Sequence, residues 1–382
     1  MTLPKPVGRE PVGRDLPAGM TVRPLERADL PSVAALFRQT FEIGPSRVEP
    51  ALAAFFGRTL LDQPWSDPDI RPLVAIDESG LAVGFVAAEV RRMRLQGRTL
   101  RFAWAAHTAV APAARSHAAG FLLMRRLLDG PQDATLGDSA SPLMEQMWLR
   151  LGGQRLDLKG IHWVRVFRPS SVAARLVVPR RPRLWAGIRA VAGGLDRVTS
   201  TVARPLIVPG PATTAEEILT PEAVLEALPR VARRVGLRPA YDEEFLGWVF
   251  GELQRVKGRG ELVARLVRDG RGRAIGWYVY FLRPGWRSEV LQVAATGERA
   301  LGAVLDNLLA HAYAHGSAAL RGRLEPGMLD AVAQRGCLLW YRGAAVAHAR
   351  DPGLLAAIES RNALITRLDG DPWVDKLVDV TP

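Results

Sequence analysis

The order of predicted helices and strands repeats once along this chain of 382 residues, and the repeat limits the folds that the chain can adopt. The first half begins with a short strand, "MTVRPL" (20–25), and two amphipathic helices, at 29–37 and 49–61. In order, there follow strands at 71–76, 82–95 and 99–110, a helix, a strand at 134–137, a helix at 141–151 and a strand pair at 155–167. The second half has helices at 221–235 and 242–256, strands at 261–268, 274–283 and 286–295, a helix at 300–315, a strand at 318–324, a helix at 326–334 and a strand at 337–342. The repeat predicts an internal structural duplication of an α+β domain.

Composition shifts divide the chain into four segments. We expect a disordered tail (1–19), a first domain (20–167), an Arg/Pro-rich connector (168–215) and a second domain (216–382). Between residues 168 and 204 the connector holds eight arginines against one acidic residue, Asp196. Three interpretations of this strip stay open: a solvated, partly packed connector, a weak contact with an anionic membrane, and a contact with RNA phosphates.

The net charge of +12 does not by itself predict nucleic-acid binding. Lysine occurs only four times among the 51 basic residues, which indicates a coding habit that favours arginine, and the excess charge gathers in the connector. The single cysteine, Cys337, excludes an internal disulfide and a cysteine-rich metal site. With no apolar leader at the N-terminus, we expect a cytoplasmic protein of bacterial type that binds no metal.

The most informative local stretch joins a strand to a helix, "HTAVAPAARSHAAGFLLMRRLL" (107–128). Its connection consists of small residues around one arginine, Arg115, and the following helix has an apolar face. Main-chain N–H groups at a helix start bind phosphate groups, and small side chains let the anion approach the backbone. The same small residues also suit a tight strand-to-helix connection that binds nothing.

This stretch resembles the phosphate-binding element of the GNAT superfamily of acyl-CoA-dependent acyltransferases, Arg/Gln-x-x-Gly-x-Gly/Ala, with Arg115, Ala118 and Gly120 at the defined positions. "SPLMEQMWLRLGG" (141–153) resembles the next helix of that family, which ends in Leu-Gly. The resemblance implies a mixed α/β (α+β) fold of two GNAT-like domains, each a mostly antiparallel, splayed sheet flanked by helices. It also implies acetyl-CoA or another acyl-CoA as co-substrate. The implied coenzyme A site comprises Ala109, Val110, Arg115, Ser116, His117, Ala118, Ala119 and Gly120.

Two positions depart from the family pattern. Ala118 stands where the first glycine is usual, which moves the loop slightly away from the phosphates. Trp148 stands where many members have a tyrosine that protonates the leaving thiolate, and an indole is no useful proton donor. Water or another side chain must then protonate the thiolate, or the thiolate must leave unprotonated. Trp148 itself would line the substrate site.

His107 is the candidate general base, because it lies on the strand before the loop and an imidazole suits removing a proton from an amine. Glu89, on the preceding strand, is its rival. The alternative for His107 is a hydrogen-bonded structural histidine. Asp138 and Ser139, at the end of the following strand, are candidates for the acceptor site, although a serine there also suits a helix N-cap, at Ser139 or Ser141.

The second half resembles a degenerate GNAT domain. Its corresponding loop, "TGERALG", has Gly297 where the arginine is expected if Gly302 matches Gly120, so we expect no coenzyme A there. Near the C-terminus, "ITRLDGDPW" brings Asp369, Asp371 and Trp373 together, as part of an acceptor pocket or as a terminal turn.

The resemblance implies an acyltransferase that moves an acetyl or short acyl group by direct attack on the thioester. The acceptor would be an amine, or a hydroxyl, on a small or amine-bearing molecule, and nucleic acid is not the expected partner. Two other functions stay open: a non-catalytic GNAT-like scaffold or binding protein, and a Fem-type transferase that uses aminoacyl-tRNA.

Overall fold

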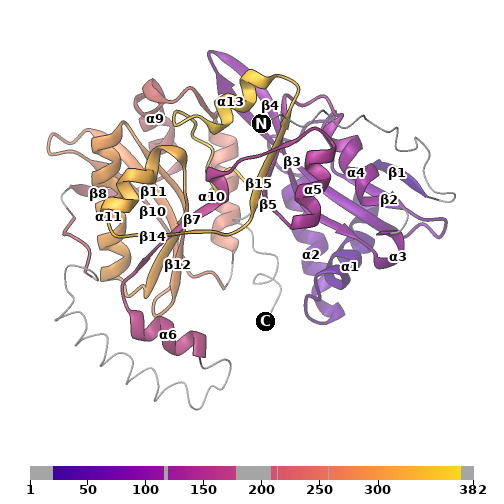
Figure 1. Cartoon of the computed structure of the whole chain (residues 1–382), viewed down its shortest axis with the longest axis horizontal. Helices are drawn as coiled ribbons and strands as arrows, with labels where there is room; N and C mark the ends of the chain where they lie inside the picture. The colour runs from indigo at the N-terminus through magenta and orange to yellow at the C-terminus, as the bar shows by residue number, and fades with distance from the viewer. Residues whose placement is uncertain (1–19, 116–118, 178–207, 213, 257, 371–382) are drawn as a thin grey trace, which may run out of the picture.

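The computed structural model describes residues 20–115, 119–177, 208–212, 214–256 and 258–370. These residues form two mixed sheets that stand side by side, each covered by helices on both faces (Figure 1). The predicted disordered tail and most of the predicted connector, with its arginine strip, lie outside the described residues. None of the helices in the described part of the chain is both long and apolar enough to cross a membrane.

The first sheet has the strand order β1-β2-β3-β4-β5-β15-β6, with β9 paired to β3. Its strands are β1 (Thr21–Pro24), β2 (Leu73–Ile76), β3 (Ala82–Leu95), β4 (Arg98–Val110), β5 (Ala134–Ala140), β15 (Ala344–Ala349), β6 (Gln154–Arg155) and β9 (Leu237–Pro239). All neighbours are antiparallel except β4 and β5.

The second sheet has the corresponding order β8-β10-β11-β12-β13-β7-β14. Its strands are β8 (Ala215–Ile218), β10 (Glu261–Arg268), β11 (Ala274–Leu282), β12 (Arg287–Ala295), β13 (Ala319–Arg323), β7 (Ile161–Val166) and β14 (Leu338–Tyr341). The single parallel pair is β12 with β13, at the position that β4 and β5 occupy in the first sheet. Seven matching strand positions confirm the two-domain α+β fold that the repeated element order predicts.

The two halves exchange one strand each. β15, from the second half, lies between β5 and β6 of the first sheet, and Figure 1 shows it beside β5. β7, from the first half, lies between β13 and β14 of the second sheet. The strand pair expected at 155–167 is therefore wrong, because β6 and β7 belong to different sheets. The ranges 20–167 and 216–382 describe the order of elements along the chain, but neither range alone supplies a complete sheet.

Alternating side chains on the central strands bury both faces of the first sheet. Phe85 and Ala87 of β3 belong to the core under α1 (Leu30–Thr40) and α2 (Glu49–Phe56), which continues as a π-helical turn (Gly57–Leu61). Val86 and Ala88 belong to the core under α4 (Ala119–Leu128) and α5 (Pro142–Arg150). Gly84 allows the close approach of α4, since a Cβ there would lie 2.8 Å from Leu123 Cδ1.

The same arrangement recurs in the second half. α9 (Pro221–Val231) and α10 (Glu243–Arg255) share one core with α1 and α2, and Figure 1 shows α10 between the two sheets. α11 (Glu298–Ala314) and α12 (Leu329–Gln334) cover the other face of the second sheet. Trp65 fixes the junction, because its ring stacks on Phe245 with centroids 3.6 Å apart and its Nε1 donates to Asp242 at 2.8 Å.

Three short helices complete the described structure. α3 (Pro112–Arg115) follows β4, α6 (Pro169–Val177) follows β7, and α13 (Pro352–Glu359) follows β15. α13 packs on β15, and the remaining described residues, 360–370, run back between the two sheets to the polar contacts described below.

Candidate functional site

The first sheet opens where β4 and β5 part. The two strands pair in parallel only from Phe102 with Ala134 to Trp104 with Leu136, although β4 continues to Val110 and β5 to Ala140. Beyond that point the strands diverge, and a cavity of about 440 Å³ lies between them and the second half. Its lining falls into residues of the diverging strands (Ala105, His107, Thr108, Gly137, Asp138, Ser139, Ala140), apolar residues (Phe37, Phe41, Ile43, Met144, Trp148, Val346), Ser141, and basic residues (His162, Arg259, Arg321, Arg323, Arg342, Arg367).

β4 is bulged at this opening. Phe85 pairs with Ala109 and Ala87 with Ala106, so the two residues His107 and Thr108 stand opposite one residue of β3. His107 has a φ of 52°, a left-handed backbone conformation that is unfavourable for a residue with a side chain. A bulge interrupts the regular hydrogen-bonding ladder and redirects the strand. Here it turns the backbone at 107–108 toward the cavity, which both residues line.

The structure brings the two predicted catalytic residues together, but beneath the cavity wall. His107 Nε2 lies 3.4 Å from Glu89 Oε1, and the side chain of His107 is 0% exposed. Its ring contacts the rings of Phe37, Phe55 and Phe56, with centroids 5.6–6.1 Å apart. The imidazole is thus enclosed by aromatic rings on one side and by a carboxylate on the other.

Glu89 is held as a carboxylate within the protein. Burial raises its pKa, but the hydrogen bond from His107 and the charge of Arg91 outweigh burial and leave the pKa below its ordinary value. Arg91 donates to Glu89 Oε2 at 2.7 Å, to Gln63 at 2.9 Å and to the carbonyl oxygen of Asp369 at 2.9 Å. The Glu89–His107 pair therefore belongs to a buried network that ties the bulge to the C-terminal part of the described chain.

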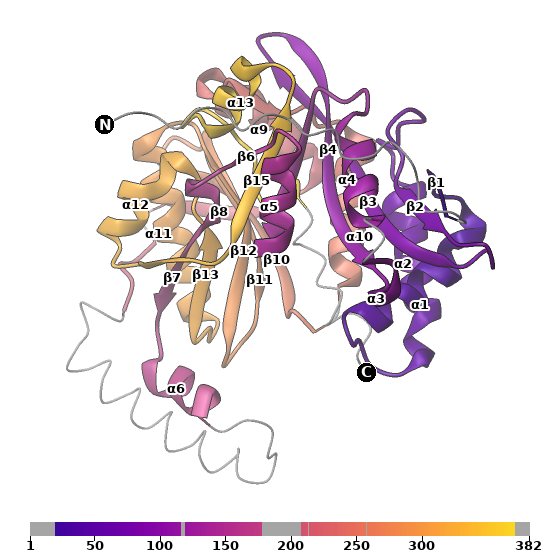
Figure 2. The same cartoon turned by 45° about the vertical axis from the view of Figure 1, so that its right-hand side comes forward.

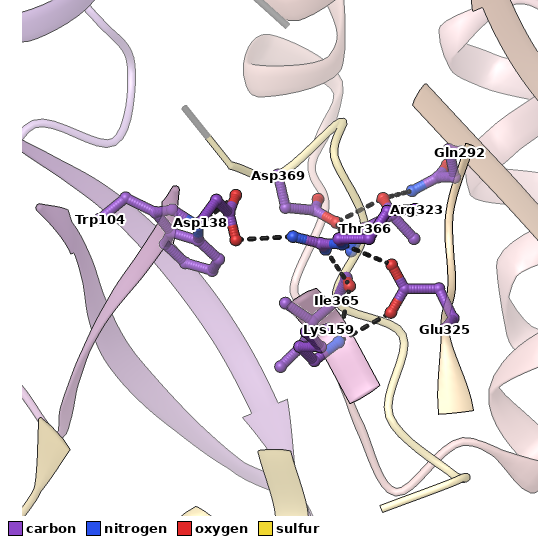
Figure 3. A network of polar contacts seen from close by, with 9 residues as sticks. All are labelled: Trp104, Asp138, Lys159, Gln292, Arg323, Glu325, Ile365, Thr366 and Asp369. Atoms are coloured by element: carbon purple, nitrogen blue, oxygen red, sulfur yellow. Dashed lines mark hydrogen bonds and ion pairs between the residues drawn. The ribbon is translucent and has the colours of Figure 1, made fainter. Parts of the chain in front are cut away.

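Asp138 lines the cavity, as predicted for an acceptor-site residue, and it also joins the two halves. Its Oδ1 accepts from Arg323 at 2.6 Å and its Oδ2 from Trp104 Nε1 at 3.3 Å (Figure 3). The side chains of Asp138 and Arg323 are only 3% and 2% exposed. Gly370 packs directly against this pair, since a Cβ there would lie 1.8 Å from Asp138 Oδ2. Only glycine fits that close approach.

Arg323 is the centre of the network in Figure 3. Besides Asp138, it donates to Glu325 at 3.0 Å and to the carbonyl oxygen of Ile365 at 2.8 Å. Burial lowers the pKa of Arg323, but the nearby charges of Asp138 and Glu325 raise it above its ordinary value. Lys159 donates to Glu325 at 2.7 Å, and burial lowers the pKa of this lysine. Two cations and two carboxylates thus compensate one another at the junction of the two halves.

Ser139 and Trp148 take different positions at the cavity. Ser139 is exposed and lines it, whereas Ser141 is the N-cap of α5 and accepts from the Met144 amide at 3.3 Å. Trp148 lines the cavity but is 1% exposed, and its ring packs against Gly137, where a Cβ would lie 3.5 Å from the indole. The tryptophan therefore fills the base of the opening and donates no proton there.

The described part of the predicted coenzyme A site lies where α4 begins. Ala109 is buried, and Ala119, the first residue of α4, is fully buried. Gly120 faces the end of β4, since a Cβ there would lie 3.3 Å from Val110 Cγ2. The side chain of Arg115 and residues Ser116, His117 and Ala118 lie outside the described residues. Their binding of coenzyme A stays a prediction.

The corresponding opening in the second half is filled by the chain itself. β12 and β13 pair from Arg287 with Ala319 to Glu289 with Arg321 and then diverge. Leu368 donates its amide to the Leu291 carbonyl oxygen at 3.1 Å, and Gln292 donates to Thr366 Oγ1 at 3.0 Å. Residues 366–368 thus lie along β12, at the position that corresponds to the cavity of the first half. Glu298, in the first turn of α11, also places a negative charge at the helix start that corresponds to α4.

Sequence reasoning missed the basic wall of the cavity. Arg259 precedes β10, Arg321 lies on β13, Arg342 follows β14, and Arg367 lies in the segment that fills the second opening. No spacing in the sequence connects these four positions. The one available signal was the abundance of arginine, which the sequence analysis attributed to a coding habit and to the connector.

Each half of this chain has a sheet with one parallel pair that diverges and with helices on both faces, and the solved GCN5-related N-acetyltransferases described next share this fold. No family model and no curated protein matches its sequence. Among solved structures, a GCN5-related N-acetyltransferase from Kribbella flavida is 16% identical, with a TM-score of 0.55, covering 88% of this chain and 73% of that chain. One from Anabaena variabilis is 10% identical, with a TM-score of 0.55 and coverages of 86% and 72%.

The likeness extends to an enzyme solved with its acyl donor. The structure of Saccharomyces cerevisiae N-myristoyltransferase with bound myristoyl-CoA matches with a TM-score of 0.52 and 11% identity, covering 91% of this chain and 86% of that chain. At these identities the comparisons establish the fold of both halves.

Proposed function

We propose that this protein is an acyl-CoA-dependent acyltransferase that moves an acetyl or short acyl group to an amine bound in the first-half cavity. The observation that carries the proposal is the divergence of β4 and β5 beyond Trp104 and Leu136, which opens a cavity lined by residues of both strands. The free N–H groups at a helix start favour the diphosphate of coenzyme A, and the opening between the strands would admit its thioester arm.

The bulge at His107 and Thr108 would act on the thioester. Backbone groups that are fixed before the substrate arrives stabilise developing negative charge without reorganising. The enclosed His107 ring, held by Glu89, supports the strained bulge from beneath. The roles of His107 and Glu89 as general bases stay predictions, and their burial favours this supporting role.

The acceptor would enter from the side of the second half, because that half supplies the opposite wall of the cavity. Attack on the thioester carbon would be direct: the new bond to nitrogen forms, the bond to sulfur breaks, and coenzyme A leaves as the thiolate. The proton that the amine nitrogen loses would pass, through water, to that thiolate. Ser139, exposed at the end of β5, is positioned to contact the acceptor. Holding donor and acceptor in one enclosed space supplies much of the rate enhancement in such a reaction.

Replacing Arg115 by glutamate tests the proposal. Arg115→Glu puts a negative charge beside the start of α4, so we expect acetyl-CoA binding, measured by calorimetry, to weaken at least about tenfold. The matched control is Arg271→Glu, because Arg271 is exposed in the turn between β10 and β11, far along the chain from the cavity residues of the first half. Circular dichroism should show both variants folded. Equal acetyl-CoA affinity in the wild type and Arg115→Glu would overturn the assignment.

A second candidate is a binding protein of the same fold that performs no transfer. Trp148 favours it, because a buried indole replaces the tyrosine expected to protonate the thiolate. Tight acetyl-CoA binding without release of free thiol across a panel of amines would support this candidate over the enzyme.

A further inference from the structure

We propose that the acceptor carries an oxyanion, a carboxylate or a phosphate, and that Arg321 and Arg342 with His162 bind it at the second-half wall of the cavity. The inference rests on the proposed function, since it names the class of molecule that enters the same cavity. It concerns the wall opposite the diverging strands, and the residues of that wall are not part of the predicted coenzyme A site.

The wall is assembled from separate elements of the second half and one exchanged strand. Arg321 lies on β13 and Arg342 follows β14, on either side of β7, which carries His162. Arg259 and Arg367 extend the same wall. Because β7 comes from the first half, the exchange of strands itself builds this surface.

The wall holds more positive than negative charge among the described residues. Glu289 accepts from Arg321 Nε at 2.9 Å, from Arg259 at 3.2 Å and from Arg367. Arg342 has no carboxylate within 4.0 Å among the residues that the structure describes. Several guanidinium groups around one carboxylate repel one another, and a bound anion would relieve that repulsion.

The pKa of Arg342 reflects the same crowding of positive charges. Arg342 is exposed, yet partial desolvation, followed by the charges of Arg321 and Arg367, lowers its pKa to about 10. A lowered arginine pKa means that the surroundings disfavour the cation. The guanidinium nonetheless keeps its charge at neutral pH, so it remains a strong, bidentate donor for a carboxylate or phosphate.

His162 supplies an independent observation. Its side chain lines the cavity, the residue is only 7% exposed, and its Nδ1 has no hydrogen-bond partner among the described residues. Burial, then the charges of Arg367 and Arg342, lowers its pKa to about 3, so the ring is neutral at neutral pH. A buried polar atom without a partner costs free energy unless a ligand or water satisfies it.

The wall suits the acceptor better than the diphosphate of coenzyme A. α4, where the diphosphate is predicted, packs on β2, β3 and β4 of the first sheet, whereas the arginines come from the second sheet and its flanking segments (Figure 2). Phe37, Phe41 and Ile43 line the first-half side of the same cavity. An acceptor that reaches both sides would place its anion on the arginines and its amine toward the bulge.

Inorganic pyrophosphate tests the wall without requiring catalysis. We expect calorimetry on the full chain to show pyrophosphate binding that weakens about tenfold in Arg342→Gln and in Arg321→Gln. Binding should persist in Arg115→Glu and in the control Arg271→Gln, which removes the same charge from an exposed turn. Because no carboxylate lies within 4.0 Å of Arg342 among the described residues, Arg342→Gln breaks no ion pair there and should fold, and its acetyl-CoA affinity should equal that of the wild type. The inference would be overturned if pyrophosphate binding were lost in Arg115→Glu but unchanged in Arg342→Gln. It would also be overturned if Arg342→Gln bound acetyl-CoA more weakly than the wild type.

Matched pairs of amines then show whether the acceptor's anion is a phosphate or a carboxylate. Release of coenzyme A thiol is followed with ethanolamine against O-phosphoethanolamine, and with propylamine against β-alanine. We expect the anionic member of at least one pair to have the higher kcat/KM, and Arg342→Gln to remove about tenfold of that advantage through KM. The phosphate pair and the carboxylate pair show which oxyanion is preferred. Equal turnover within both pairs would overturn the inference while leaving the transferase itself supported. Wild-type protein that binds no acetyl-CoA would overturn the proposed function and, with it, the assignment of the bound anion to an acceptor.

Discussion

The two halves of this protein open their sheets at the same place and use the opening differently. In the first half, β4 and β5 diverge around a cavity of about 440 Å³. In the second half, β12 and β13 diverge at the matching position, and residues 366–368 occupy the space beside β12. The duplicated fold thus supplies two potential sites, and the segment after α13 fills one while helping to form the wall of the other.

The comparison also shows how the second half contributes to the first-half cavity. Arg367 lies in the filling segment and faces the first-half cavity, while Arg323 of β13 is fixed by Asp138 of β5. The second half therefore forms one wall of the first-half cavity, on the side where we propose that the acceptor binds. Three experiments test how the two halves depend on each other, from the pairing of a whole sheet to the titration of a single side chain.

Separating the halves should have the largest effect. A fragment of residues 20–167 lacks β15, so β5 loses its antiparallel partner, and its own β7 has no sheet to join. We expect this fragment to lack a cooperative unfolding transition and a dispersed amide spectrum. Co-expression with residues 208–382 should restore both. A dispersed spectrum from the isolated fragment would show that the strand exchange is dispensable.

Filling the opening between β4 and β5 should reproduce the situation in the second half, where the corresponding opening is occupied. Thr108 lines the cavity beside the bulge, so Thr108→Trp would place a large ring where the thioester is proposed to enter. We expect acetyl-CoA affinity, measured by calorimetry, to fall about tenfold or more, with the fold retained. Thr99→Trp, at an exposed position near the other end of β4, is the matched control. Unchanged affinity in Thr108→Trp would place the donor outside this cavity.

The smallest effect concerns the titration of His162. Because its pKa in the folded protein is lowered to about 3, the unfolded chain binds more protons than the folded chain between about pH 6.5 and pH 3. This group therefore contributes a loss of stability as pH falls through that window. Denaturant unfolding of His162→Gln should depend less on pH there than unfolding of the wild type, and saturating pyrophosphate should reduce the difference. Identical pH dependence in the two proteins would contradict the buried, neutral state of this histidine.

The sequence was sufficient to predict the elements but not all of their pairing. Periodic apolar residues and turn signals located β2, β3, β4 and the helix of residues 119–128 to within a few residues, because such patterns are local. The pair expected at 155–167 was wrong, because the strands beside β6 and β7 are far away in the chain: Gln154 pairs with Ala347, and Val166 pairs with Ala319. Register between distant strands has no local signature.

The sequence likewise located the residues of the first-half strands at the candidate site but not the residues that surround them. His107, Glu89, Asp138, Ser139 and Trp148 all lie at or beneath the opening, since they sit on strands and a helix that sequence analysis placed correctly. Their surroundings followed from tertiary packing. The aromatic rings around His107 and the pairing of Asp138 with Arg323 come from elements that the spacing of the sequence does not connect.

By itself, the sequence determined the repeated order of helices and strands and the small-residue connection before α4, because both depend on neighbours along the chain. Only the tertiary structure decided that the halves exchange strands, that one opening is filled and that four arginines share a wall. Those features arise from contacts between residues far apart in sequence. The balance of burial and charge that selects such contacts exists only once the chain is packed.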